Sequence, residues 1–283
     1  MRPLWTLVEG AVSYPEIVDF LTETHVYEEE GLAWDFLGIA QSELRRRTRI
    51  LGAAYPFEQA PDNLQLLRRD RQSSRDPYVF CLLLSLPAHF RRWATTWGPA
   101  QGAHRSLFEQ VAQQACQRIF AGWTVQSFGW GPGAAMPKGQ IVHEVAAALH
   151  STVLNTDVFA TANDGGVDIL CHKLFLDAWG GYPAIMVQCA TGLSDYSRKA
   201  VEPNLDMWRR AVDLYNSPKR SLAVPFSLDQ REISELTTAA NGTILDRIRL
   251  IEAFAAGEGL PAGLAQQIEA WAAPAAAQLP LYE

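Results

Sequence analysis

The sequence predicts an α/β (α+β) fold preceded by a mainly helical N-terminal region. Two observations indicate the fold class. Short apolar runs typical of buried strands alternate with amphipathic stretches from about residue 105 onward, and the run at 166–172 directly follows two glycines that allow a turn. A third observation concerns residues 1–50, where apolar residues recur at steps of three and four, as in helices. We therefore expect two parts, residues 1–100 and residues 101–283.

The composition limits the class of protein. Hydrophobic residues make up 48% and charged residues 19% of the 283 positions, which is ordinary for a globular chain. No run reaches the roughly 18 apolar residues of a membrane helix, so no membrane partner is expected. The start lacks a secretory pattern, and the four cysteines form no CxxC pair, which predicts reduced, buried thiols in a cytoplasmic protein.

The net charge of −7 argues against a protein that coats nucleic acid non-specifically, because neutralising phosphates needs an excess of lysine and arginine. It does not exclude a nuclease, in which an acidic metal site offsets a local basic groove. Arginine clusters at 45–49 and 68–75 are typical of solvated surfaces. The same clusters make the N-terminal region a candidate for contact with the DNA backbone or with a partner protein.

In the N-terminal part, the helical periodicity stops at residues 55–77, where prolines and many charges predict loops. The apolar run at 77–86, PYVFCLLLSL, fits either a central strand or a buried helix, because its content of β-branched residues is low. Glycines and a proline at 95–105 mark the expected domain boundary.

From residue 105 the expected order is helix, strand, helix, strand, strand, helix and strand. The corresponding ranges are 105–121, 123–130, 140–150, 166–172, 183–190, 202–215 and 221–228. The first helix has apolar residues along one face and carries Glu109 near its start. Pro203 stands in the first turn of the later helix, where a missing N–H is tolerated. The remainder of the chain is expected to be mostly helical.

Asp168 stands out within the stretch NDGGVDILCHK, residues 163–173, because it is an acid inside an apolar strand. A buried carboxylate costs free energy unless something pairs with it. A helix cap, an arginine or a metal ion would each serve.

The chain has a helix with Glu109, a strand with Asp168, and a following strand that ends close to Gln188. This arrangement resembles the core of the restriction-endonuclease-like, or PD-(D/E)xK, nuclease superfamily, over roughly residues 105–250. The pairing of GGVDIL with VQCA resembles its Mrr-like branch, where Gln replaces Glu. The resemblance implies a mixed central sheet flanked by helices. It also implies that Asp168, Glu109, Gln188 and the Cys189 carbonyl bind Mg²⁺ or Mn²⁺.

The sequence departs from the family at Ala190, where a catalytic lysine is expected beside the attacking water. Lys199 is the candidate for a displaced lysine. The run QCATG followed by a lysine, a proline and a tryptophan, with a later DRIR segment at 246–249, resembles a subgroup associated with bacterial defence islands. The implied activity is metal-dependent hydrolysis of DNA phosphodiester bonds against phage or other foreign DNA.

The chemistry gives independent support for such a set of residues. Magnesium prefers oxygen ligands and keeps several waters, so two carboxylates with an amide and a carbonyl oxygen are sufficient. A bound cation activates water and clamps phosphate oxygens. A nearby lysine meets developing negative charge.

Several alternatives remain open at this stage. Asp168 could cap a turn, Gln188 could face solvent, Lys199 could be an ordinary surface residue, and Glu109 could interact with its helix dipole. The chain could be a catalytically degenerate subunit of the same fold that binds DNA or a partner protein of a defence system. It could also be an acidic interaction protein without nucleic acid. A homo-oligomer is left open. No zincin motif, phosphate loop or GxSxG motif is present.

Overall fold

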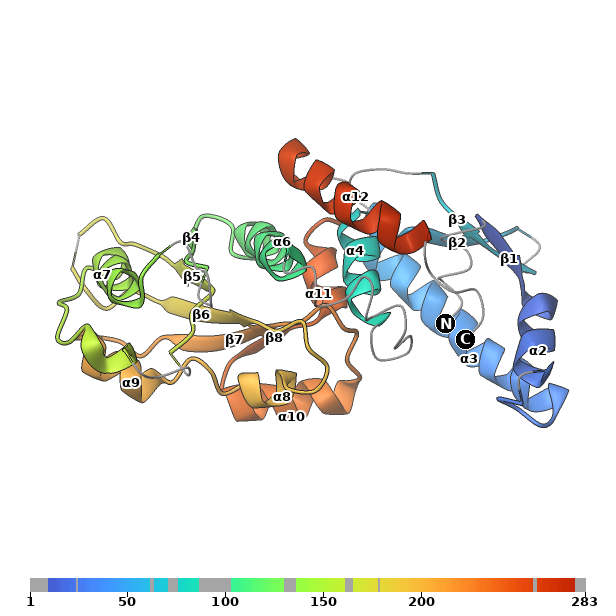
Figure 1. The fold of residues 1–283 in the computed structure, drawn as a ribbon, viewed down its shortest axis with the longest axis horizontal. Coiled ribbons are helices and arrows are strands. Elements are labelled where there is room, and N and C mark those ends of the chain that lie inside the picture. The colour runs from blue at the N-terminus through green and yellow to red at the C-terminus, as the bar shows by residue number, and fades with distance from the viewer. Residues whose placement is uncertain are drawn as a thin grey trace. The chain divides into compact units, whose positions relative to one another are not determined.

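The computed structural model describes residues 10–23, 25–61, 64–70, 76–86, 103–129, 136–160, 165–177, 179–256 and 259–277. The chain forms two compact units, drawn in Figure 1. Unit 1 consists of residues 1–100 and 254–283, and unit 2 consists of residues 101–253. The sequence-based division instead placed residues 254–283 with the second part. Most of the predicted boundary at 95–105 lies outside the described residues.

Unit 1 combines helices with a small antiparallel sheet of order β1-β3-β2. Its elements in chain order are β1 (Ala11–Ser13), α2 (Tyr14–Glu23), α3 (Glu30–Leu51), the 3-10 helix η1 (Gly52–Ala54), β2 (Phe57–Gln59), β3 (Gln65–Arg68), α4 (Asp76–Leu84) and α12 (Ala262–Ala277). The helices match the prediction for this region. The strands β2 and β3 lie where loops were predicted, because three- and four-residue strands are too short to give a clear alternation.

The apolar run at 77–86 is a helix, α4, which begins at Asp76 and has Pro77 in its first turn. Most residues of this helix are buried, which explains why apolar residues occupy all of its sides. The C-terminal helix α12 packs against α4, and the rings of Phe80 and Trp271 lie 5.3 Å apart, edge to face. This contact explains why the C-terminal segment belongs to unit 1.

Unit 2 contains a five-stranded mixed sheet of order β4-β5-β6-β7-β8, flanked by helices. Its elements are α6 (Ala103–Ile119), β4 (Thr124–Ser127), α7 (Lys138–Ala148), η4 (Asp157–Phe159), β5 (Ile169–His172), β6 (Ala184–Cys189), α8 (Tyr196–Lys199), α9 (Leu205–Ala211), β7 (Lys219–Ala223), α10 (Gln230–Ala240), β8 (Thr243–Leu245) and α11 (Arg247–Glu252). The strands β4, β5 and β6 are antiparallel neighbours, whereas β6, β7 and β8 run parallel. The predicted mixed α/β architecture is therefore confirmed.

Figure 1 shows α6 on one face of this sheet and α9 and α10 on the other. The strands and helices predicted between 105 and 228 are all present. The helices α6 and α7 begin and end two residues earlier than predicted, and the other elements are shorter. The strand β8 was not predicted, because it is short and follows Asn241 and Gly242 in what was expected to be helix. A Cβ at Gly242 would overlap the carbonyl oxygen of Arg220, so the close approach of β7 and β8 at this point requires glycine.

Local side-chain contacts set the ends of the helices around the sheet. Asn204 caps α9 by accepting the N–H groups of Asp206 and Met207. Asp229 and Glu232 form a reciprocal capping box at the start of α10. These caps satisfy N–H groups that a helix start otherwise leaves unpaired.

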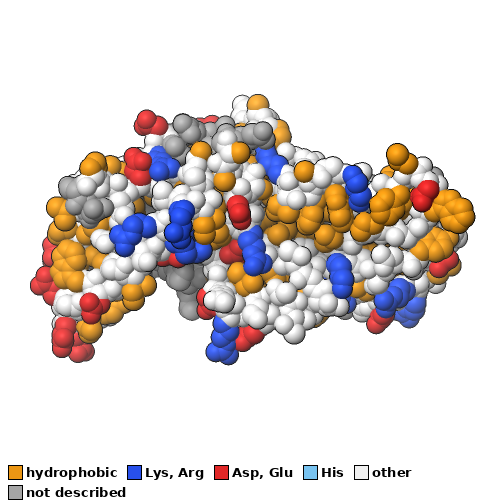
Figure 2. Space-filling model, turned by 180° about the vertical axis from the view of Figure 1, so that it is seen from behind, with side chains coloured by type: hydrophobic (Ala, Val, Ile, Leu, Met, Phe, Trp, Pro, Cys, Tyr) orange, Lys and Arg blue, Asp and Glu red, His pale blue; other side chains and the backbone are white. Residues whose placement is uncertain are grey.

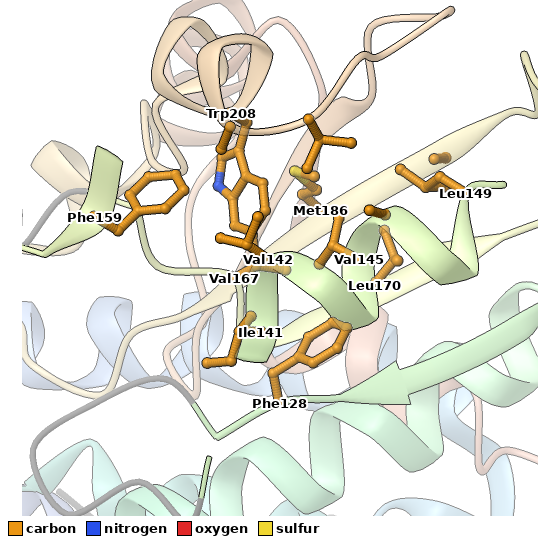
Figure 3. Packing of buried hydrophobic residues seen from close by; sticks show 14 residues of the cluster. Phe128, Ile141, Val142, Val145, Leu149, Phe159, Val167, Leu170, Met186 and Trp208 are labelled. Carbon is orange, nitrogen blue, oxygen red and sulfur yellow. The ribbon is translucent and has the colours of Figure 1, made fainter. Parts of the chain in front are cut away.

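A buried cluster joins α7 and α9 to one face of the sheet, with Trp208 at its centre (Figure 3). Trp208 is fully buried, its ring lies 4.8 Å from that of Phe159, and its Nε1 donates to the carbonyl of Gly165 at 3.0 Å. A Cβ at Gly165 would overlap the Phe159 ring. The segment that leads into Asp168 is therefore anchored by packing on Trp208 and Phe159.

Two expectations from composition can be compared with the structure. None of the helices in the described ranges is long and apolar enough to cross a membrane. The predicted burial of free thiols is confirmed for the four cysteines, Cys81, Cys116, Cys171 and Cys189.

We predict that Trp208→Ala lowers the free energy of unfolding by about 3–5 kcal/mol, because it leaves a cavity and removes the hydrogen bond to Gly165. Trp208→Phe should cost less, since a ring still packs on Phe159. Trp179, which is 77% exposed, is the matched control, and its replacement by alanine should change stability by no more than about 0.5 kcal/mol. Urea unfolding followed by circular dichroism measures all three. Equal effects at positions 208 and 179 would contradict this packing account.

Candidate functional site

Asp168 lies directly before β5, and neighbouring strands hold its backbone on both sides. Its N–H donates to the carbonyl of Val187 at 3.1 Å, and its carbonyl accepts the N–H of Phe128 at 3.0 Å. The side chain is 2% exposed. Its Oδ2 accepts the backbone N–H of Cys189 at 2.6 Å. Among the described residues this N–H is the carboxylate's only hydrogen-bond partner, so within them neither an arginine nor a helix cap neutralises Asp168.

Gln188 follows Val187, which pairs with Ile169 in the antiparallel register of β5 and β6. It is 6% exposed and thus does not project into solvent. Its Oε1 is buried and finds no hydrogen-bond partner in the described part of the chain. A buried polar atom without a partner costs about 1–3 kcal/mol, so this oxygen is suited to bind an additional group.

Glu109 on α6 and Lys199 on α8 lie close enough to Asp168 for their charges to act on it. The negative charge of Glu109 raises the pKa of Asp168, and the positive charge of Lys199 lowers it. Lys199 also lowers the pKa of Glu109, as does Arg105. The structure thus brings Asp168, Glu109 and Lys199 from separate elements into one electrostatic neighbourhood.

Burial is the main cause of the altered pKa of Asp168. Burial and the Glu109 charge together raise this pKa to about 8, against the opposing effects of the Cys189 N–H and Lys199. Burial likewise raises the pKa of Glu109. Two carboxyl groups held together in this way favour a shared proton or a bound cation. The nearby Cys189 thiol has its pKa raised by burial and by the same two carboxylates.

Packing accounts for the alanine at position 190, where the resemblance implies a lysine. Ala190 is buried in an apolar cluster that also contains Ala200 and Leu222. Ala200 directly follows α8, so the small side chain at 190 allows the end of α8 to pack next to the end of β6. This packing places Lys199, the last residue of α8, near Asp168. The Lys199 ammonium makes no hydrogen bond or ion pair with any described residue.

The set of donors fits Mg²⁺ or Mn²⁺ better than a soft metal. In the described residues, no three or more His, Cys, Asp or Glu side chains form a group that could hold a metal ion. Magnesium is commonly held by only one or two carboxylates together with water and substrate phosphates. Asp168 and Glu109 are compatible with such a site, and Gln188 remains a predicted ligand. The Cys189 carbonyl remains a predicted ligand.

Sequence reasoning did not single out Glu202, whose charge also raises the pKa of Asp168. Its side chain is 12% exposed and accepts a hydrogen bond from Arg198 at 2.8 Å. The sequence contains one indication of its proximity to the site, because Glu202 lies three positions, or about one helical turn, after Lys199. Glu202 adds negative charge to the neighbourhood of the site while Arg198 partly offsets it.

The first and last residues of the DRIR segment, Asp246 and Arg249, make hydrogen bonds that stabilise the local structure. Asp246 caps α11 by accepting the N–H of Arg249 at 3.1 Å, and it also accepts the N–H of Leu228 at 3.2 Å. Arg249 donates to the carbonyl of Ile244 at 2.8 Å. These contacts connect β8, α11 and the segment after β7 and do not involve Asp168.

No protein-family model, no curated protein and no solved structure matches the chain. The resemblance to restriction-endonuclease-like nucleases therefore rests on the sequence motifs alone.

We predict that Asp168→Asn makes the protein less sensitive to pH. A carboxyl group whose pKa is raised on folding stabilises the folded state below its unfolded pKa near 4, and this stabilisation is lost as the pH rises through about 8. Asparagine stays neutral and can still accept the Cys189 N–H. Near pH 8 the variant should exceed the wild type in free energy of unfolding by at least about 1.4 kcal/mol, the equivalent of one pKa unit.

Denaturant unfolding across this pH range, without divalent cations, measures the effect. Asp213→Asn is the control, because Asp213 is exposed, and it should follow the wild-type curve. A wild-type stability that stays flat between pH 4 and 8 would show that Asp168 is not held protonated.

Proposed function

We propose that unit 2 is a metal-dependent DNA endonuclease of the restriction-endonuclease-like class, which hydrolyses phosphodiester bonds in bacterial defence against phage or foreign DNA. One observation carries the proposal. The buried Asp168 lies within reach of the charges of Glu109 and Lys199, and the neighbouring strand β6 carries Gln188 with its unpaired oxygen. These are the residues that the family resemblance assigns to metal binding and catalysis.

The order of elements supports the same proposal. The helix, three strands and helix that carry the resemblance correspond to α6, β4, β5, β6 and α9. The helices α7 and η4 are inserted between β4 and β5, and α8 is inserted between β6 and α9. The sheet is mixed, as the resemblance implies. Asp168 and Gln188 stand at the adjoining ends of the two central strands, β5 and β6. Glu109 comes from α6, which packs against β4, β5 and β6.

The proposed chemistry divides between a cation and the side chains of the chain. A divalent cation would lower the pKa of a water and neutralise phosphate oxygens. Asp168 and Glu109 supply anionic oxygens for it, and Gln188 and the Cys189 carbonyl supply neutral ones. The N–H of Cys189 holds Asp168 in a fixed orientation, so little reorganisation is needed when charge develops.

Lys199 has the role of the displaced catalytic lysine. Its ammonium group is uncommitted among the described residues and acts on both carboxylates. It can orient the attacking water and meet negative charge on the phosphate. Arg105, one helical turn before Glu109, is a second cation whose charge acts on Glu109, and it would contact the DNA backbone.

The second candidate is a catalytically degenerate subunit of the same fold, which binds DNA or a partner protein without cleavage. Ala190 favours this candidate, because the family's usual lysine position is filled by a buried apolar residue. Under this alternative, the pairing of Asp168 with the Cys189 N–H is retained for structure alone.

Incubation of the full-length protein with plasmid DNA and Mg²⁺ or Mn²⁺ tests the proposal. We predict cleavage by the wild type, and a loss of at least about 100-fold in rate for both Asp168→Asn and Lys199→Ala, because each removes a group that acts on the transition state. The matched control is Lys219→Ala. Lys219 is an exposed lysine of the same unit that pairs with Ile185 at the opposite end of β6 from Gln188, and its replacement should leave the rate unchanged.

The outcomes separate the two candidates. Cleavage that persists in Lys199→Ala would remove Lys199 from the mechanism. Wild-type protein that binds DNA in a salt-dependent way but cleaves no substrate with either metal would favour the degenerate subunit.

A further inference from the structure

Helix α3 in unit 1 is apolar on two faces, and unit 1 covers one of them. Ala33, Leu37 and Leu51 are buried. Leu32, Phe36 and Ile39 follow one another at steps of four and three and therefore share a face. Their side chains are 49%, 41% and 71% exposed, respectively. Monomeric proteins rarely expose contiguous apolar residues in this way without an interaction partner.

The exposed face continues along the helix without an unpaired charge. Glu43, Arg46 and Ile50 extend the line at further steps of four, three and four. Glu43 is bound by Arg46 and by Arg47, each at 2.7 Å, and these contacts lower its pKa to about 2. Ile50 is half-buried. We call the face formed by Leu32, Phe36, Ile39, Glu43, Arg46 and Ile50 the α3 stripe.

The two ends of the α3 stripe carry opposite charges. Glu28, Glu29 and Asp35 lie at its N-terminal end, and Arg46 and Arg49 lie at its C-terminal end. Asp35 and Arg49 are exposed, and neither forms an ion pair with another described residue. On the face of unit 1 drawn in Figure 2, Asp and Glu side chains gather at the outer margin, with hydrophobic side chains beside them and Lys and Arg side chains further in.

We infer that the α3 stripe is a homodimer interface in which α3 packs antiparallel against α3 of a second copy. A two-fold axis near the middle of the stripe would bring Leu32 of one copy against Ile50 of the other and Asp35 close to Arg49. Because a two-fold interface contains each contact twice, the pairing of Asp35 with Arg49 would form at two places in the dimer. A parallel arrangement would pair the apolar residues with their own copies but bring like charges together at both ends. The antiparallel register instead sets Phe36 against Arg46 and Ile39 against Glu43, whose charges are already paired within the helix.

This inference is independent of the proposed nuclease activity, because it involves only residues of unit 1. The chain also supplies its own control. Trp34 is 40% exposed on the same helix, but it lies about 200° around the axis from Leu32, and its Nε1 donates to Glu30 at 3.2 Å. A dimer formed through the α3 stripe leaves Trp34 outside the interface.

Sedimentation equilibrium of the full chain measures the dimer Kd. We predict a wild-type dimer, and a Kd at least about tenfold higher for Ile39→Glu, because the new glutamate of each copy would be buried against Glu43 of the other copy, a pair of like charges. Trp34→Glu should leave the Kd within about twofold of the wild-type value. Circular dichroism and thermal melting of each variant establish that it folds.

A charge exchange tests the antiparallel direction. Asp35→Arg and Arg49→Glu should each weaken the dimer, and the double variant should recover most of the wild-type Kd at low salt. A wild-type chain that is monomeric at all concentrations would overturn the inference. Equal effects of Ile39→Glu and Trp34→Glu would also overturn it. A double variant as weak as the single ones would refute the antiparallel pairing.

Discussion

The Asp168 carboxylate is buried at the end of the central sheet, beside the charge of Glu109, with the Cys189 N–H as its only hydrogen-bond donor among the described residues. Burial of two neighbouring carboxyl groups opposes folding once both are ionised, so the surrounding structure has to hold them in place. Trp208 and Phe159 anchor the segment before Asp168, and β4 and β6 fix its backbone on either side. On the neighbouring strand β6, the side-chain oxygen of Gln188 is buried without a hydrogen-bond partner among the described residues. A cation bound there would remove the strain that the fold otherwise maintains.

The lysine of this neighbourhood comes from a helix and not from the strand that carries Gln188. Ala190 and Ala200 pack in one apolar cluster, and this close packing of β6 and α8 brings Lys199 into electrostatic range of Asp168 and Glu109. The alanine at position 190 and the location of Lys199 thus belong to a single packing arrangement. A lysine at 190 would have to be buried among Leu222 and its neighbours, where an unpaired ammonium is strongly disfavoured.

Much of unit 2 could be predicted from sequence, because its helices and central strands have clear periodicity and glycine or proline at their ends. The short strands β2, β3 and β8 could not, since three or four residues carry too little pattern. The burial of Asp168 could be inferred from its apolar neighbours, but its bond to the Cys189 N–H depends on the register of β5 and β6. Glu202 was missed because its effect on Asp168 arises from tertiary contact. Likewise, periodicity shows that α3 has two apolar faces, whereas only the structure shows which face is exposed.

The central claim is that Asp168 and Glu109 form a site for a divalent cation. Isothermal titration with Mg²⁺ or Mn²⁺ near pH 7, in two buffers of different ionisation enthalpy, tests it directly without DNA. Because Asp168 has a pKa of about 8, we expect cation binding to release about one proton. Asp168→Asn should abolish binding or the proton release that accompanies it. Failure of either cation to bind, or equal proton release by the wild type and Asp168→Asn, would contradict the claim.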